Sequence, residues 1–167
     1  MISLKIAGPG DTGTIRDIAY CTWPVAYAEI LSPEQLKYML ELFYSQEALT
    51  KQLVQQGHRF IILYEEGNAA GFASFSEKNK EAPSMWRLHK LYVLPDQQGK
   101  GFGQTLLKQL TMIVSSEGGT SIELNVNRRN KALHFYTQAG FVISGEEDID
   151  IGNGYFMNDF VMVKQLQ

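Results

Sequence analysis

The sequence has very little cysteine, few histidines and no long apolar run. Its single thiol, Cys21, rules out an internal disulfide and fits a reducing compartment, and we expect it to be buried or half-buried. The histidines, His58, His89 and His134, are scattered and give no metal-ligand spacing, so no metal is expected. No apolar stretch approaches membrane-spanning length, and the first residues lack the pattern of a signal peptide. We therefore expect a cytoplasmic protein without a membrane segment.

An excess of positive charge is also missing. The formal net charge is −3, and Arg128-Arg129 is an isolated basic pair, so we expect no nucleic-acid partner. Hydrophobic residues make up 44% and charged residues 20% of the chain, as is typical of a soluble globular protein. A length of 167 residues predicts one domain, spanning residues 1–167.

The most informative segment joins an apolar strand, a proline, a glycine-rich turn and the start of an amphipathic helix. It reads LYVLPDQQGKGFGQ from Leu91 to Gln104, and apolar residues follow at helical spacing. Glycines at positions 99, 101 and 103 let the backbone approach a ligand and leave the N–H groups at the helix start accessible. With the helix dipole behind them and Lys100 beside them, these donors predict a site for a pyrophosphate group.

Two common phosphate-binding patterns do not fit this segment. A Walker loop needs Gly-Lys-Ser/Thr four residues after a first glycine, and a dinucleotide fingerprint needs a third glycine where Gln104 or Leu106 stands. The residues from Gln98 to Gly103 instead resemble the acyl-CoA loop of the GNAT N-acetyltransferase superfamily, Arg/Gln-x-x-Gly-x-Gly/Ala. For this loop alone, a glycine turn that caps an ordinary helix is an equal alternative.

A second segment resembles the same superfamily. The residues NKALHFYTQAGF from Asn130 to Phe141 are similar to the GNAT signature Asn-x-x-Ala-x-x-Phe/Tyr-Tyr-x-x-x-Gly-Phe, with Asn130 one residue closer to Tyr136 than is usual. A strand is expected before this segment, at residues 121–126. Because two signatures occur in the right order with a strand between them, we prefer the GNAT reading to that of two unrelated helices.

The remaining patterns predict the order βααα-βββ-α-β-α-ββ. Ser32 and Ser45 are expected to begin the second and third helices, and a polar loop is expected at residues 78–83. Turns are expected at residues 65–68 and at Gly152-Asn153-Gly154. This succession predicts an α+β fold with a mixed, mostly antiparallel twisted sheet flanked by helices, and it matches the GNAT order.

The resemblance implies a cofactor and a way to bind it. GNAT enzymes transfer an acetyl group directly from acetyl-CoA to an amine, and the central strand separates from its neighbour beyond the acetyl site. The implied acetyl-CoA-binding residues are Leu91, Tyr92 and Val93 through their backbone, the loop Gln98, Gly99, Lys100, Gly101, Phe102, Gly103 and Gln104, and Asn130. The N–H near Val93 or Leu94 would polarise the thioester carbonyl. For Asn130, capping the short helix is the alternative.

The resemblance also implies the proton-transfer groups. Tyr136 is the expected general acid for the departing thiolate, with ring packing as the alternative. Some family members carry a glutamate base on the strand before the loop, but residues 86–90 offer no carboxylate. His89 is the remaining titratable candidate on that strand, with a cleft or core histidine as the preferred alternative, and Glu77 could act through water.

The acceptor is the least determined part. The early helices combine aromatic residues with carboxylates, namely Trp23, Tyr27, Tyr38, Phe43 and Tyr44 with Glu29, Glu34 and Glu41. Such a set would hold a cationic amine, although helical spacing also makes several of these residues core. The chain resembles a bacterial GNAT branch with PaiA-like polyamine acetyltransferases. We expect acetyl-CoA and a small primary amine as partners. A non-catalytic acyl-CoA-binding sensor, a protein N-acetyltransferase and a homodimeric state all remain open.

Overall fold

The computed structural model describes residues 1–167, apart from the side chain of residue 83. Within these described residues the chain forms seven strands and five α-helices. In chain order they are β1 (Ile2–Ile6), α1 (Thr12–Ala26), α2 (Pro33–Tyr44), α3 (Gln46–Val54), β2 (Arg59–Glu65), β3 (Asn68–Asn79), β4 (Ala82–Val93), α4 (Phe102–Ser116), β5 (Ser121–Asn127), α5 (Ala132–Gln138), β6 (Val142–Gly152) and β7 (Tyr155–Gln165). This succession confirms the predicted order of elements.

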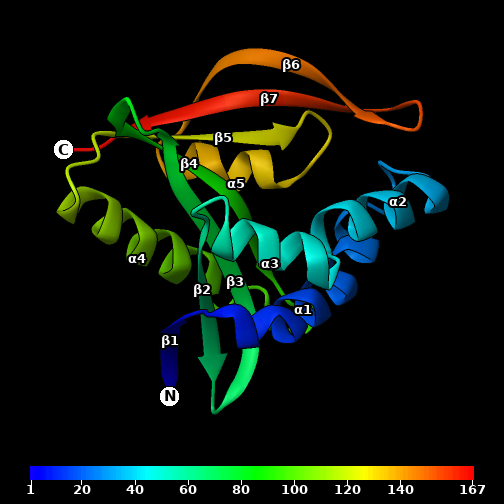
Figure 1. The fold of residues 1–167 in the computed structure, drawn as a ribbon, viewed down its shortest axis with the longest axis horizontal. Coiled ribbons are helices and arrows are strands. Elements are labelled where there is room, and N and C mark those ends of the chain that lie inside the picture. The colour runs from blue at the N-terminus through cyan, green and yellow to red at the C-terminus, as the bar shows by residue number, and fades with distance from the viewer. The chain divides into compact units, whose positions relative to one another are not determined.

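The strands follow the hydrogen-bonded order β1-β2-β3-β4-β5-β7-β6 (Figure 1). β4 and β5 pair in parallel, whereas β1–β2, β2–β3, β5–β7 and β6–β7 pair antiparallel. The predicted α+β fold with a mixed, mostly antiparallel sheet is therefore confirmed.

The contacts of the chain define two compact units. The first contains Met1–Ser76 and Lys90–Met112, and the second contains Glu77–His89 and Ile113–Gln167. The boundary divides β3, β4 and α4 between the two units. The expectation of a single domain remains a prediction.

The core of the first unit is an aromatic cluster between its helices and strands. Trp23 of α1 contacts Tyr44 of α2 with ring centroids 5.5 Å apart. Tyr44 contacts Phe72 of β3 at 6.2 Å, and Phe72 stacks on Phe60 of β2 at 6.2 Å. This packing joins α1 and α2 to β2 and β3 through aromatic side chains. The expected serine caps are present: the Ser32 and Ser45 hydroxyls accept hydrogen bonds from the N–H groups of Gln35 and Ala48.

The second unit is built on β5, β7 and β6, which run side by side (Figure 1). Ile122 and Leu124 of β5 are buried, as are Trp86 and Leu88 at the beginning of β4. Gly119 allows the chain after α4 to pass close to Trp86, because a Cβ at this position would lie 2.8 Å from the indole ring. The β6–β7 turn is formed by Asn153 and Gly154 with φ of 55° and 78°, as the glycine-rich pattern predicted.

Two sequence expectations were wrong. Residues 78–83 do not form a loop, because β3 continues to Asn79 and β4 already begins at Ala82. The Asn79 side chain accepts a hydrogen bond from the Glu81 N–H at 2.9 Å, and this local bond closes a tight turn. Cys21 is exposed rather than buried, because it lies on the solvent side of α1, whereas Thr22 and Trp23 are buried.

Candidate active site

The glycine loop has the conformation that its sequence requires. Gly99 and Gly101 have φ of +83° and +81°, in the left-handed region that side chains other than glycine rarely adopt. A Cβ on either residue would have no atom within 4 Å, so the loop backbone is not covered by neighbouring groups of the described chain. The glycines therefore set the loop conformation and leave space beside it.

The N-terminus of α4 presents donors next to this loop. The N–H of Thr105 donates to the Gly101 carbonyl at 3.0 Å, which makes this the first helical hydrogen bond at this end. The N–H groups of Phe102, Gly103 and Gln104 precede it and have no acceptor within the helix. Because α4 is 15 residues long, its dipole adds to these donors, and the arrangement suits an anionic group such as a pyrophosphate.

Two side chains fix the loop from outside. The Lys100 ammonium lies 3.0 Å from Glu65 Oε2 and 2.9 Å from Gln97 Oε1, so a carboxylate already offsets its charge. The Gln98 amide donates to the Val93 carbonyl at 3.2 Å and thereby links the loop to the end of β4. The backbone N–H groups are therefore better candidates than Lys100 for binding an anion at this loop.

The end of β4 lies against β3 and α1 in the same unit. The Tyr92 hydroxyl is 2.9 Å from the Tyr27 hydroxyl, and its ring contacts Trp23 and Phe72. Gly71 of β3 allows a close approach, since a Cβ there would lie 2.8 Å from the Tyr92 carbonyl oxygen. The Tyr92 side chain and the close approach of β3 therefore hold the strand segment Leu91 to Val93 in place.

The N–H of Leu94 is not available as the donor to a thioester carbonyl. It donates to the Ala70 carbonyl at 2.8 Å. Of the two donors expected near the end of β4, Val93 is the one that remains a candidate.

Lys90 is a feature that sequence reasoning missed. Its Nζ donates to Gln52 Oε1 at 2.8 Å and lies over the rings of Tyr44 and Phe60 at 5.5 and 5.6 Å. Burial lowers the pKa of this lysine from 10.5 to about 7. Burial and then the neighbouring Lys90 charge lower the pKa of His58 to about 4. In the sequence, the only sign that Lys90 is buried was its position within an apolar strand pattern.

The second unit contains the other predicted site residues. Tyr136 of α5 is buried, and its ring contacts Phe135 and Phe141 with centroids 5.3 and 5.7 Å apart. Asn130 Oδ1 accepts a hydrogen bond from the Ala132 N–H at 2.9 Å, just before α5. His89 is half-buried on β4. The roles of Tyr136, Asn130 and His89 remain predictions.

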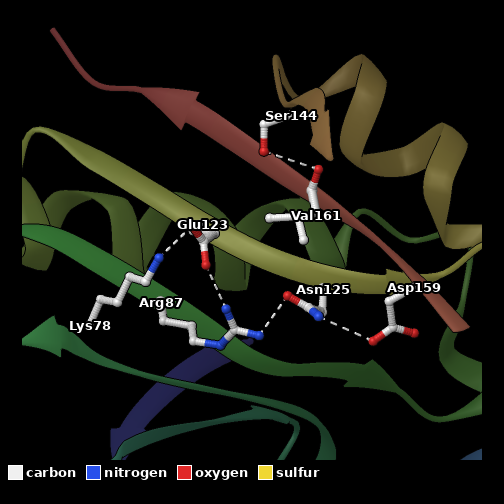
Figure 2. Close-up of polar contacts among 7 residues, drawn as sticks. All are labelled: Lys78, Arg87, Glu123, Asn125, Ser144, Asp159 and Val161. Carbon is white, nitrogen blue, oxygen red and sulfur yellow. Dashed lines mark hydrogen bonds and ion pairs between the residues drawn. The ribbon is translucent and has the colours of Figure 1, made fainter. Parts of the chain in front are cut away.

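A chain of polar contacts joins side chains of four strands, β3, β4, β5 and β7, within this unit (Figure 2). Glu123 of β5 accepts from Lys78 Nζ at 2.8 Å and from Arg87 Nη1 at 2.7 Å. Arg87 Nη2 also donates to Asn125 Oδ1 at 2.6 Å, and Asn125 Nδ2 donates to Asp159 Oδ2 of β7 at 3.3 Å. The parallel pairing of β4 with β5 that the structure records for the described residues ends at Leu88–Leu124, beside this chain of contacts.

Comparison with known proteins identifies the family that shares these features. The family model described as "Acetyltransferase (GNAT) domain" matches residues 27–156, which is more than half of the chain. The chain belongs to the GNAT acetyltransferase family. The predicted GNAT resemblance is confirmed, and the chain is an N-acetyltransferase.

Two relatives of this GNAT protein come from Thermoplasma acidophilum. The chain is 28% identical to a spermidine N(1)-acetyltransferase over 162 residues, covering 94% of this chain and 92% of the relative. It is similar to the crystal structure of a PaiA N-acetyltransferase in complex with coenzyme A, with a TM-score of 0.84, 26% identity and 99% coverage of both chains. The PaiA-like relationship is confirmed.

A third relative of the GNAT chain acts on a protein. It is a ribosomal protein bS18 alanine N-acetyltransferase from Haemophilus influenzae, 31% identical over 103 residues, which cover 60% of this chain and 64% of the relative. The relatives thus include one named for spermidine and one named for an alanine of a ribosomal protein.

The aromatic residues of the early GNAT helices are mostly core. Trp23, Tyr27 and Tyr44 are buried, which confirms the core interpretation for these three. Glu29 and Glu34 are exposed. Among the described residues, no helix is long and apolar enough to cross a membrane.

Proposed function

We propose that this GNAT protein is an acetyl-CoA-dependent enzyme that transfers the acetyl group directly to a primary amine of a small molecule in the cytoplasm, with polyamines as the first candidates. One observation carries the cofactor assignment. A strand leads into two left-handed glycines and an α-helix whose first N–H groups have no intrahelical acceptor. This arrangement suits a pyrophosphate, which coenzyme A contains.

The proposed binding mode follows the direction of the chain. The pyrophosphate accepts hydrogen bonds from the N–H groups around Gly101 to Gln104, and the pantetheine arm lies along Leu91 to Val93. The Val93 N–H then polarises the thioester carbonyl, because the Leu94 N–H is already bonded to Ala70. Calorimetric titration with acetyl-CoA tests this mode. We expect micromolar binding, and no detectable heat would contradict the proposal.

Tyr136 is proposed to protonate the leaving thiolate. A phenol titrates near pH 10, so it can donate to a thiolate of similar basicity. We expect Tyr136→Phe to lower kcat by about 100-fold while the Kd for acetyl-CoA changes by less than about twofold. Tyr20→Phe is the matched control, because Tyr20 lies on α1 and its hydroxyl contacts Glu41. Unchanged turnover in the Tyr136 variant would remove this residue from the mechanism.

The acceptor is proposed from chemistry and from the relatives. The net charge of −3 favours a cationic substrate, and the Thermoplasma acidophilum relative is a spermidine N(1)-acetyltransferase. A panel of spermidine, spermine, neutral amines and a peptide with an N-terminal alanine, measured by thiol release, tests this choice. We expect the polyamines to react fastest.

The other readings predict different outcomes of the same panel. Preference for the peptide would indicate a protein N-acetyltransferase, the class of the Haemophilus influenzae relative. Acetyl-CoA binding without thiol release on any amine would indicate a non-catalytic acyl-CoA sensor.

A further inference from the structure

Lys90 places an amine among uncharged groups of the first unit. Its Nζ donates to Gln52 Oε1 at 2.8 Å and lies over the rings of Tyr44 and Phe60, 5.5 and 5.6 Å from their centroids. A buried charge is costly unless an opposite charge lies beside it. An amine in these surroundings therefore favours its uncharged form.

Two other lysines of the same unit show the usual arrangement. Lys5 Nζ lies 2.8 Å from Asp11 Oδ1, and Lys100 Nζ lies 3.0 Å from Glu65 Oε2. Each of these ammonium groups thus has a carboxylate beside it. The hydrogen-bond and ring partners recorded for Lys90 among the described residues include no carboxylate.

The titratable groups around Lys90 are uncharged at neutral pH. Burial lowers the pKa of Lys90 from 10.5 to about 7. Burial and then the Lys90 charge lower the pKa of His58 to about 4, and burial raises the pKa of the Tyr44 phenol well above its ordinary value. Lys90 is therefore the member of this cluster that changes its charge near pH 7.

Gln52 of α3 fixes the position of the Lys90 amine. Its Nε2 donates to the Phe43 carbonyl of α2 at 3.0 Å, so its Oε1 is the atom turned toward Lys90. The uncharged amine donates one hydrogen to Oε1, and its nitrogen lone pair can take up a proton. Gln52 is a positioning residue for this lone pair.

The strand that carries Lys90 also carries the proposed thioester donor. The Leu94 N–H donates to the Ala70 carbonyl of β3 at 2.8 Å. Backbone groups of successive residues alternate between the two edges of a strand, so the Val93 N–H points to the edge away from β3. A thioester carbonyl bound there would lie on the strand that carries Lys90.

The distance between the two groups requires water. Lys90 precedes Val93 by three positions, about 10 Å along an extended strand, and its four-carbon stem covers part of this distance. Lys90 as a whole is half-buried, so part of its side chain reaches solvent although burial acts on the amine. Water is therefore part of the proposed path.

We propose that Lys90, in its uncharged form, accepts through water the proton that the acceptor nitrogen loses as it bonds to the thioester carbonyl carbon. The inference rests on the proposed function, and the residues that it uses all lie in the first unit. A nitrogen that has formed the new C–N bond is far more acidic than a free alkyl ammonium, which titrates at about pH 10. A base that is uncharged at neutral pH is therefore strong enough for this step.

Protons and electrons balance in this step. The lone pair of the uncharged amine forms the C–N bond, and one nitrogen proton passes to water while water gives one to Lys90. The carbonyl re-forms, the C–S bond breaks, and its electron pair leaves with the thiolate. The thiolate then takes up one proton and Lys90 returns one to solvent, which leaves the amide and the thiol of coenzyme A.

Lys90→Met removes the base and keeps an unbranched side chain. With spermidine as the probe and thiol release as the readout, we expect kcat/KM about 100-fold below that of the wild type at about pH 8. At about pH 6, roughly nine-tenths of the wild-type Lys90 is protonated, so the deficit should shrink to about tenfold. The ionisation of spermidine cancels in this ratio, because both proteins meet the same amine at each pH.

A nearby lysine supplies the matched control. Lys51 is an exposed residue of α3, next to Gln52 in the sequence, and Lys51→Met should leave kcat/KM unchanged at every pH. In Lys90→Met the Kd for acetyl-CoA should change by less than about twofold in calorimetry. A deficit of equal size at both pH values would overturn the proposal in favour of a structural role, and unchanged turnover would overturn it as well.

A second variant keeps the lysine and changes its partner. Gln52→Glu preserves the size of the side chain and puts a carboxylate where Oε1 now lies 2.8 Å from Nζ. An opposite charge at this distance favours the ammonium and raises the pKa of Lys90. The advantage in kcat/KM over Lys90→Met should therefore begin at higher pH than in the wild type, and an unmoved onset would contradict the role of Lys90.

Two further measurements keep the outcomes distinct. Urea unfolding at each assay pH shows whether a variant is folded, so a loss of folded protein is not mistaken for a loss of the base. A wild type that binds acetyl-CoA but acetylates no amine overturns the proposed function and the Lys90 role together. An active wild type whose advantage over Lys90→Met does not depend on pH overturns the Lys90 role alone.

Discussion

Lys90 should make the stability of this protein depend on pH in a predictable way. Its ammonium lies in the first unit between Gln52, Tyr44 and Phe60, without a carboxylate partner among the described residues. Burial lowers its pKa from 10.5 to about 7. Replacing it with methionine keeps an unbranched side chain and removes the charge.

The sign of the effect follows from proton binding. Between about pH 7 and 10.5 the unfolded chain holds the proton and the folded protein does not. Because the unfolded state binds more protons in this range, raising the pH stabilises the folded wild type. At two pH units above the folded-state pKa, the free energy of unfolding of the wild type is about 2 kcal/mol higher than at the pKa itself. Lys90→Met has no such gain, and it loses a roughly constant 1 kcal/mol because Gln52 Oε1 no longer has its donor.

Urea unfolding near pH 6, 7, 8 and 9, followed by tryptophan fluorescence, measures the difference between the two proteins. We expect the stability of Lys90→Met relative to the wild type to decrease by about 2 kcal/mol between pH 7 and 9 and to stay nearly constant below about pH 6. Lys108→Met, on the exposed face of α4, should show no comparable slope. A difference that is constant from pH 6 to 9 would refute the claim that Lys90 is neutralised by burial.

Two further predictions concern the cofactor strand and loop. Gly101→Val places a β-branched residue at φ +81°, which costs about 1–2 kcal/mol, so acetyl-CoA binding should weaken about tenfold in calorimetry. Lys100→Ala should change the affinity for acetyl-CoA by less than about threefold. A larger loss of affinity in Lys100→Ala than in Gly101→Val would refute recognition by the backbone. Gly71→Ala puts a Cβ 2.8 Å from the Tyr92 carbonyl, so it should lower both the Tm and the affinity for acetyl-CoA. Gly119→Ala, which meets Trp86 at 2.8 Å in the other unit, should lower the Tm alone, and equal losses of affinity would contradict this distinction.

Features set by neighbouring residues could be read from the sequence. Ser32 and Ser45 cap helices because their hydroxyls reach N–H groups three positions further along the chain. Gly99 and Gly101 adopt positive φ because their lack of a Cβ permits it. The turn after Asn79 was difficult to predict from neighbouring residues alone. Its charged residues are typical both of a loop and of an exposed hairpin.

The sequence by itself determined the order of elements, the glycine loop and the GNAT family, because each depends on residue types at fixed short spacing. Only the tertiary structure decided which ionisable groups are buried and which have partners. Lys90 meets Gln52 across 38 positions, and Asn125 meets Asp159 across 34. The free energy of a charge depends on the solvent and the countercharges around it, and strand pairing brings those groups together from distant parts of the chain.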